Sequence, residues 1–182
     1  MIYTGNSRRA AQLRAMYPRG RGTDTARRLA ALWADVFARA PIGRRWVTLE
    51  VVGRRSGQPR RFPHGMADLD GHWFLVSMLG ECAWVHNARA ADGRAVLLRG
   101  GRRRPIRLVE VPETERAPIL ARYVQQVPGG RPHIPVDPGS PITQFAAVAA
   151  RYPVFEVLDA RPFCAPPDTS RARPGQRVES TC

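Results

Sequence analysis

The sequence contains no lysine, so every strongly basic side chain is an arginine. The 29 basic residues face only 15 acidic ones, which leaves a formal net charge of +14 over 182 residues. The guanidinium group keeps its charge at ordinary pH, and its planar fork binds phosphates and carboxylates through paired hydrogen bonds. The arginine surplus therefore favours an anionic partner, and nucleic acid, an anionic membrane surface and a polyanionic cofactor all fit.

Cysteine is scarce and long hydrophobic runs are absent. Cys82, Cys164 and Cys182 are odd in number and irregularly spaced, which excludes a disulfide framework. No grouping of cysteine and histidine has the spacing of a zinc site, so we expect no metal. No apolar run reaches membrane-spanning length, and the N-terminus lacks a hydrophobic signal core. We therefore expect a cytoplasmic protein, with weak association with a membrane surface as an alternative.

The length suits one domain and is short for two. Residues 1–22 are polar and rich in arginine, which predicts a flexible basic segment. Residues 160–182 contain proline, arginine, serine and threonine without periodicity, which predicts a disordered tail. The remaining residues, 23–159, are predicted to form a single folded domain that binds a cofactor.

Within that domain, about six runs of strand-forming residues alternate with a few helix-compatible segments. Asp70–Gly71 and Gly100–Gly101 predict tight hairpin turns. Thr23–Thr25 can cap a helix whose apolar residues, from Leu29 to Phe37, recur at helical spacing and predict packing on the core. Further helices are expected at 83–91, 112–124 and 142–151, and strands at 46–52, 60–67, 72–78, 94–99, 102–111 and 153–158. The fold class is α+β, mainly β: a small barrel with a few packed helices.

The densest group of chemically active residues is the segment 53–63, GRRSGQPRRFP. Glycines at both ends of its loop allow a sharp turn, whose amide groups can converge on an anion. Alternation along the following strand should place Arg60 and Arg61 on opposite faces. An ordinary hairpin with solvated arginines would show the same local sequence, so this segment alone leaves both interpretations open.

A second group of residues, 83–87, begins a helix shortly after the strand that precedes it. Trp84 and Asn87 lie three residues apart, so both can face one ligand, and the start of a helix favours an anion. The alternative is that Trp84 is an ordinary core residue. His86 points away from this face and is expected at the surface or hydrogen-bonded to a neighbour.

In this order, with the Asp-Gly turn between them, the two motifs resemble the deazaflavin (F420)-dependent nitroreductase family. Its members are split β-barrel oxidoreductases with an FMN-binding-like fold, and the resemblance covers residues 45–158. It implies that the phosphate and polyglutamate tail of coenzyme F420 lies along Arg54, Arg55, Ser56, Gly57 and Arg60, with Pro63 shaping the next strand. It also implies that Ser77 and Met78 lie beside the deazaflavin ring, and that Ala83, Trp84 and Asn87 complete the pocket.

The resemblance further implies hydride transfer from reduced F420 to a small hydrophobic or conjugated acceptor: a quinone, an enone or a nitro compound. The sequence shows no paired nucleophile and base, so the catalytic residues are left unassigned. Two departures from the family lie near the ring. The segment Met78–Cys82 is short and carries an acid, and Val85 follows the tryptophan where the family has tyrosine. Nitroimidazole reduction is not carried over, because Tyr123 and Tyr152 are the only late tyrosines.

Other functions fit the same sequence. FMN or FAD could replace F420, although the many arginines of the loop favour a longer polyanionic tail. A non-catalytic binder or carrier of F420, flavin, haem or lipid would use the same barrel. An arginine-rich protein that binds nucleic acid is a third interpretation, but no reader motif is present and no specific nucleic-acid partner is expected. The oligomeric state is expected to be a monomer or a homodimer.

Overall fold

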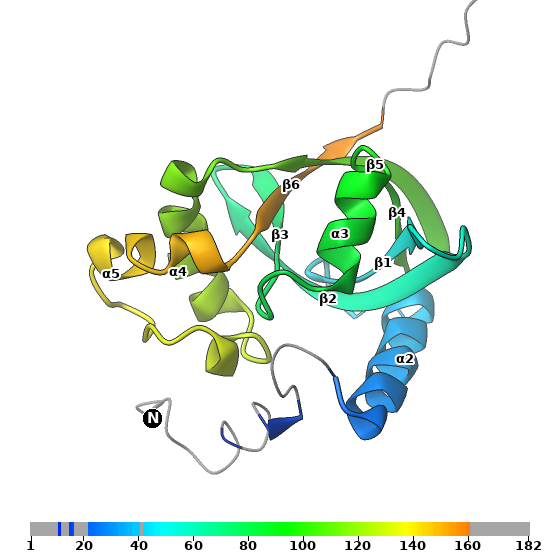
Figure 1. Cartoon of the computed structure of the whole chain (residues 1–182), viewed down its shortest axis with the longest axis horizontal. Helices are drawn as coiled ribbons and strands as arrows, with labels where there is room; N and C mark the ends of the chain where they lie inside the picture. Colours follow the sequence, from blue (N-terminus) through cyan, green and yellow to red (C-terminus); the bar gives the residue numbers. More distant parts are fainter. Residues whose placement is uncertain (1–10, 12–14, 17–21, 41, 161–182) are drawn as a thin grey trace, which may run out of the picture.

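The computed structural model describes residues 11, 15, 16, 22–40 and 42–160 (Figure 1). The predicted basic segment and tail lie mostly outside these residues and stay predictions. In chain order the elements are α2 (Asp24–Arg39), β1 (Trp46–Val52), β2 (Pro59–Leu69), β3 (His72–Val76), α3 (Ala83–Ala90), β4 (Arg94–Arg99), β5 (Arg102–Glu110), η2 (Glu113–Glu115), α4 (Arg116–Gln126), η3 (Arg131–His133), α5 (Ile142–Ala146), η4 (Ala149–Arg151) and β6 (Val154–Asp159).

The strands close into an antiparallel barrel in the order β1-β2-β3-β6-β5-β4, which confirms the predicted fold class. The predicted turns make two of its hairpins. Asp70 and Gly71 both have positive φ, 51° and 84°, as do Gly100 and Gly101, 54° and 76°. Two-residue turns of this kind match the right-handed twist of the strands that they join.

The barrel is split along one side of β2. The half of β2 from 59 to 65 pairs only with β1, and the half from 66 to 69 pairs with β3. The prediction that β3 extends to Met78 was wrong, because β3 ends at Val76. The next residue, Ser77, donates its backbone N–H to Pro153 and closes a turn with Gly80, so the chain leaves the sheet there. Part of β2 therefore has a free edge.

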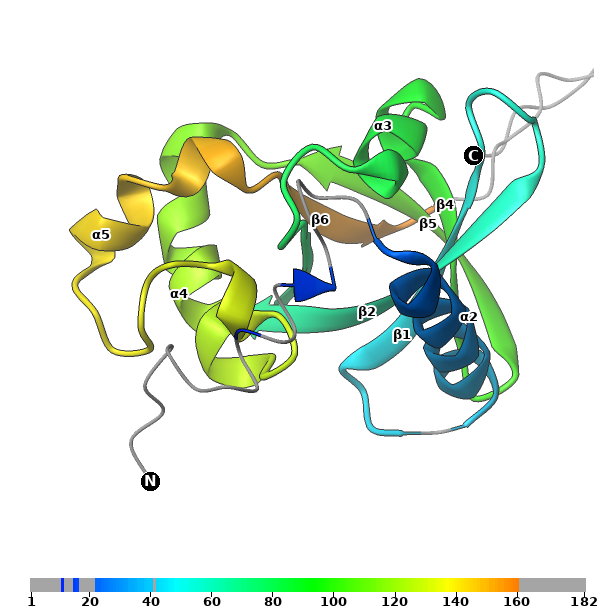
Figure 2. The same cartoon turned by 60° about the horizontal axis from the view of Figure 1, so that its bottom comes forward.

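Two apolar cores lie on either side of the sheet. Inside the barrel, residues of all six strands pack with Trp84, Val85 and Ala88, so that α3 plugs one end. Outside it, residues of β2, β3 and β6 pack against α4 and α5, which lie together beyond one wall of the barrel (Figures 1 and 2). The unpaired part of β2 therefore lies between α3, which fills one end of the barrel, and α4 and α5, which pack on its outside.

Helix α2 packs on β1, β2 and β4 through small residues. Thr23 caps it, as predicted, by accepting a hydrogen bond from the amide of Ala26 at 3.2 Å. The prediction that its large apolar residues face the core was wrong in part. Ala26, Ala34 and Ala38 are buried, whereas Leu29, Leu32 and Trp33 are 42–59% exposed. Among the described residues, no helix has both the length and the hydrophobicity needed to cross a bilayer.

Candidate active site

A cavity of about 650 Å3 lies at the split, within the usual size range of small-molecule sites. β2 and the turn after β3 form its two edges, α2 forms one wall, and α4 with the loop after it forms another. Its lining, in the described part of the chain, contains no Asp, Glu or Arg. The residues are Met16, Leu29, Ala30, Trp33, Phe37, Ile42, Trp46, Phe62–Gly65, Val76–Leu79, Trp84, Tyr123, Val127, Gly129, Gly130 and His133.

His64 brings a polar group to this apolar lining. Its ring stands edge-on to Trp84, with centroids 4.8 Å apart. Its Nε2 is buried and has no hydrogen-bond partner among the described residues. Burial lowers the pKa of His64 to about 4, so the ring is neutral at physiological pH. A buried polar atom without a partner costs stability, and a bound ligand could satisfy it.

The burial of His64 should make stability depend on pH. An unfolded histidine takes up a proton below pH 6.5, whereas folded His64 resists it until about pH 4. Its contribution to stability is therefore complete above pH 6.5 and is lost as the pH falls toward 4, by up to about 3 kcal/mol. Urea denaturation at pH 7 and pH 5 should show this loss in the wild type and a smaller one in His64→Phe. Equal losses of stability between pH 7 and pH 5 in the wild type and in His64→Phe would contradict the assignment.

The basic loop between β1 and β2 closes through its own backbone. The amide of Gly53 donates to Gln58 at 2.9 Å, and the amide of Gly57 donates to Gly53 at 2.8 Å. A Cβ on Gly53 would lie 2.8 Å from Ser56 Oγ, and Gly57 has a φ of 65°. Both positions therefore need glycine. Ser56 is not free, because its Oγ accepts from the amide of Gln58 at 3.3 Å.

The arginines of the loop fall into two groups. Arg55 and Arg60 are exposed and have no carboxylate partner in the described part of the chain. Arg61 faces the other way: its Nε donates to Glu50 at 2.9 Å, and Asp35 of α2 is within 3.9 Å. The predicted alternation of Arg60 and Arg61 is thus observed, and only one of the two remains available to an anion.

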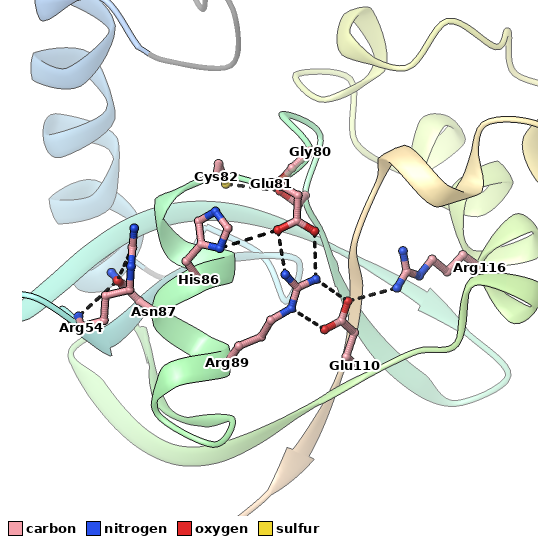
Figure 3. Close-up of polar contacts among 10 residues, drawn as sticks. Arg54, Gly80, Glu81, Cys82, His86, Asn87, Arg89, Glu110 and Arg116 are labelled. Atoms are coloured by element: carbon pink, nitrogen blue, oxygen red, sulfur yellow. Dashed lines mark hydrogen bonds and ion pairs between the residues drawn. The ribbon is translucent and has the colours of Figure 1, made fainter.

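Helix α3 contacts the loop through Asn87 and the cavity through Trp84; Figure 3 shows the contact between Asn87 and Arg54. Trp84 is buried and packs in the barrel core, and it also lines the cavity, while its role toward a ligand stays a prediction. Asn87 does not line the cavity. Its Oδ1 accepts from the backbone amide of Arg54 at 3.3 Å and from the guanidinium of Arg54 at 3.1 Å. Asn87 is therefore placed to position the loop.

Asn87→Ala should loosen this connection. Removing the shared acceptor is expected to cost about 1–2 kcal/mol of stability. It should also raise the KM for F420 several-fold with little change in kcat, because the loop is displaced while the cavity stays intact. Urea denaturation and steady-state kinetics would measure both effects. Asn87→Asp, which keeps an acceptor for Arg54, should restore the KM; failure of that rescue would contradict a positioning role.

Ionic contacts hold the turn after β3 to the last turn of α3 and to β5 (Figure 3), and none of their side chains lines the cavity. Arg89 of α3 binds Glu81 at 2.7 Å and Glu110 of β5 at 2.7 Å, and Arg116 of α4 also reaches Glu110 at 3.1 Å. The hydrogen bonds from Arg89 outweigh burial and hold the pKa of Glu110 below its usual value. His86 lies 3.7 Å from Glu81 and outside the cavity lining, consistent with the sequence interpretation.

The structure brings four of the predicted site residues to the cavity: Pro63, Ser77, Met78 and Trp84. Ser77 is buried, and its hydroxyl donates to the carbonyl of Gly80 at 2.6 Å. Ala83 is exposed. Outside the cavity lining lie Arg54, Arg55, Ser56, Gly57, Arg60, Ala83 and Asn87, at the loop and along α3.

Two features of the cavity were not predicted from the sequence: His64, and the wall formed by α4 and the loop after it. The wall depends on close approach at two glycines. A Cβ on Gly65 would lie 2.6 Å from Val127, and one on Gly130 would lie 2.1 Å from the hydroxyl oxygen of Tyr123. An isolated glycine inside a strand signals such an approach, so Gly65 was a usable sign. His64 shares a strand face with Met66, which the period of two could have indicated.

A family model described as F420H(2)-dependent quinone reductase matches residues 23–135. No curated protein matches the chain. An F420-H2-dependent reductase is 21% identical, with 63% of this chain and 94% of that chain covered and a TM-score of 0.43. A conserved hypothetical protein of Mycobacterium tuberculosis is 18% identical, with 64% of this chain and 74% of that chain covered and a TM-score of 0.48. A FAD-binding protein of Mesorhizobium loti is 17% identical, with 72% of this chain and 90% of that chain covered and a TM-score of 0.43.

The family match defines the class of protein: it is an F420-dependent oxidoreductase built on a split barrel. More particularly, the chain belongs to the F420H2-dependent quinone reductase family. The resemblance seen in the sequence is confirmed at the level of family, fold and cofactor.

The residues present fit that cofactor. Its tail is a polyanion, and in the described part of the chain the guanidinium groups of Arg55 and Arg60 have no carboxylate partner and stand beside a tight turn with glycine at both ends. Its ring system is planar and conjugated with polar groups at its edge, and the adjoining cavity has an apolar lining and the Nε2 of His64, which has no partner among the described residues. Phe62 and Pro63 of the cavity follow Arg60 closely on β2, so the loop and the cavity are continuous along the chain.

Proposed function

We propose that this protein reduces an uncharged, conjugated acceptor of the quinone type at the cavity of the split. The observation that carries the proposal is the lining: it has aromatic and aliphatic walls, the neutral His64, and no Asp, Glu or Arg in the described part of the chain. Such a site accepts a planar apolar molecule and has no charge to hold an ionic substrate. Residues 23–159 would form the cofactor-binding unit.

The binding roles divide between the loop and the cavity. Arg54, Arg55, Ser56, Gly57 and Arg60 would hold the anionic tail through guanidinium groups and backbone amides, and Asn87 would keep Arg54 in place. Pro63, Ser77, Met78 and Trp84, which line the cavity, would lie toward the ring system, and Ala83 would lie next to them at the start of α3. This division is supported by the geometry of the loop and by the position of the cavity beside it.

The chain itself supplies binding, orientation and exclusion of water. When bound, reduced F420 supplies a hydride, and the overall reaction gives the oxidised cofactor and a hydroquinone that has gained two electrons and two protons. His64 would offer one hydrogen bond from its neutral ring to a bound carbonyl or ring nitrogen. Trp33 and Phe37 of α2 would cover the outer side of the acceptor.

Turnover with defined acceptors tests the proposal. Purified protein with reduced F420 would be mixed with menadione as the quinone, cyclohexenone as the enone and nitrobenzene as the nitro compound, and cofactor oxidation followed by absorbance. Menadione should be reduced with the highest kcat/KM. Faster reduction of cyclohexenone or nitrobenzene would show that the preferred acceptor is an enone or a nitro compound rather than a quinone. Tight binding of F420 without any turnover would favour the alternative, a carrier.

A further inference from the structure

The end of the barrel opposite α3 has a hollow of its own, of about 330 Å3. β1 runs from this end to the basic loop, and at about 3.3 Å per residue the two ends lie on the order of 20 Å apart. The floor of the hollow is apolar barrel interior: Val47, Met66, Leu97 and Val157. Its rim holds Trp73, Arg44, Arg99, Arg102, Arg103 and Arg104. We call this hollow the arginine mouth.

Strand alternation directs several of these arginines over the floor. On β4, Arg99 follows the buried Leu97 by two residues and so lies on the inward face. On β5, Arg102 and Arg104 share the face of the buried Ile106. The charged rim and the apolar floor are thus parts of one inward-facing surface at the end of the barrel.

The charge at the arginine mouth is only partly balanced. Arg103 binds Glu50 at 2.6 Å and Arg104 binds Asp159 at 2.5 Å. In the part of the chain that the structure describes, no carboxylate pairs with Arg44, Arg99 or Arg102. Arg99 and Arg102 are moreover direct partners in the β4–β5 register, where like charges destabilise a hairpin. An anion between them would remove that repulsion.

We propose that the arginine mouth binds a small amphiphilic anion. Its carboxylate or phosphate would lie between Arg99 and Arg102, whose guanidinium groups suit paired hydrogen bonds to oxygens. Its hydrocarbon end would lie on Val47, Met66 and Leu97, where burial of apolar surface adds affinity. The small volume favours a single short chain. The site is separate from the cavity at the split and does not depend on the acceptor proposed there.

Calorimetric titration of the full chain with decanoate and with decyl phosphate tests this site. The double variant Arg99→Gln/Arg102→Gln should bind both at least about tenfold more weakly, because two charge-assisted contacts are lost. It should fold, since it loses a repulsion rather than an ion pair. The matched control is Arg94→Gln/Arg107→Gln, an opposed arginine pair on the same hairpin that lies outside the mouth and contacts Asp92. This control should bind as the wild type does.

The probes separate the two parts of the proposal. Decanoate should bind more tightly than hexanoate, and decanol and inorganic phosphate should bind far more weakly than decanoate and decyl phosphate. Equal affinity of the first double variant and the wild type would place the ligand in the larger cavity and overturn the proposal. If inorganic phosphate bound as tightly as decyl phosphate, the apolar floor would add no affinity, and the proposed binding of a hydrocarbon chain would be overturned. If the protein bound anionic vesicles but neither decanoate nor decyl phosphate, the arginine mouth would bind a membrane surface and not a single small anion, and the proposal would be overturned.

Discussion

Replacing both Arg55 and Arg60 with alanine is expected to weaken F420 binding about 30-fold or more. Each of these side chains is exposed and lacks a carboxylate partner in the described part of the chain. Each would make charge-assisted hydrogen bonds worth about 1–3 kcal/mol to the anionic tail. The loss should shrink as salt is added, since exposed charges are screened. Fluorescence titration of the oxidised cofactor would measure the dissociation constants.

Arg61→Ala is the control, because it removes one positive charge from the position next to Arg60 on β2. Arg61 is bound to Glu50 on the other face of the strand, so its loss should leave F420 affinity near the wild-type value. Glu50 would keep Arg103 as a partner at 2.6 Å, and the protein should still fold. Equal weakening by Arg61→Ala and by the double variant would mean that general charge, rather than the loop, holds the tail.

The parts of the fold that sequence predicts correctly depend on local signals. The cap at Thr23 and the turn at Asp70–Gly71 each lie within a few residues, and both are observed. Runs of strand-forming residues between turn signals indicated the six strands close to where the structure has them. These signals belong to short segments, whose conformational preferences do not require the rest of the chain.

The features that sequence missed depend on contacts between distant residues. β3 ends at Val76 because the next partner in its register is Pro153, far along the chain, which accepts from the amide of Ser77 but has no N–H to donate in return. α2 packs through alanines because β1 and β2 approach it closely; Thr48 even donates its hydroxyl to the carbonyl of Ala34. No local pattern reports either contact. The spacing of large apolar residues in α2 therefore predicted the helix correctly but its buried face only in part.

The same distinction applies to the candidate site. The sequence places Trp84 and Asn87 on one helix, but only the structure shows that Asn87 binds Arg54 while Trp84 lines the cavity. The wall formed by Tyr123 and Gly130 comes from a helix in the second half of the chain, and its position depends on packing outside the barrel. Motif spacing indicates which residues gather near a site, whereas their separate roles follow from tertiary contacts.

Trp84→Ala is expected to lower the free energy of unfolding by about 3–5 kcal/mol, because a large buried aromatic leaves a cavity that the barrel cannot refill. Trp84 is 5% exposed, packs against Phe155 at a centroid distance of 5.3 Å, and supports the ring of His64. Its loss would open the plug between α3 and the strands. Urea denaturation measures the change, and Trp84→Phe, with a smaller loss, keeps the comparison available if the alanine variant does not fold.

Trp33→Ala provides the contrast, because Trp33 lines the same cavity from α2 while 45% exposed. Its removal should cost clearly less stability than Trp84→Ala, about 1–2 kcal/mol, since nearly half of its surface is already exposed. It should raise the KM for a quinone several-fold, because one wall of the acceptor site is gone. Similar losses of stability in the two variants would show that α2 is part of the core. An unchanged KM in Trp33→Ala would show that α2 does not contact the acceptor, which would then be bound by β2, α3 and α4 alone.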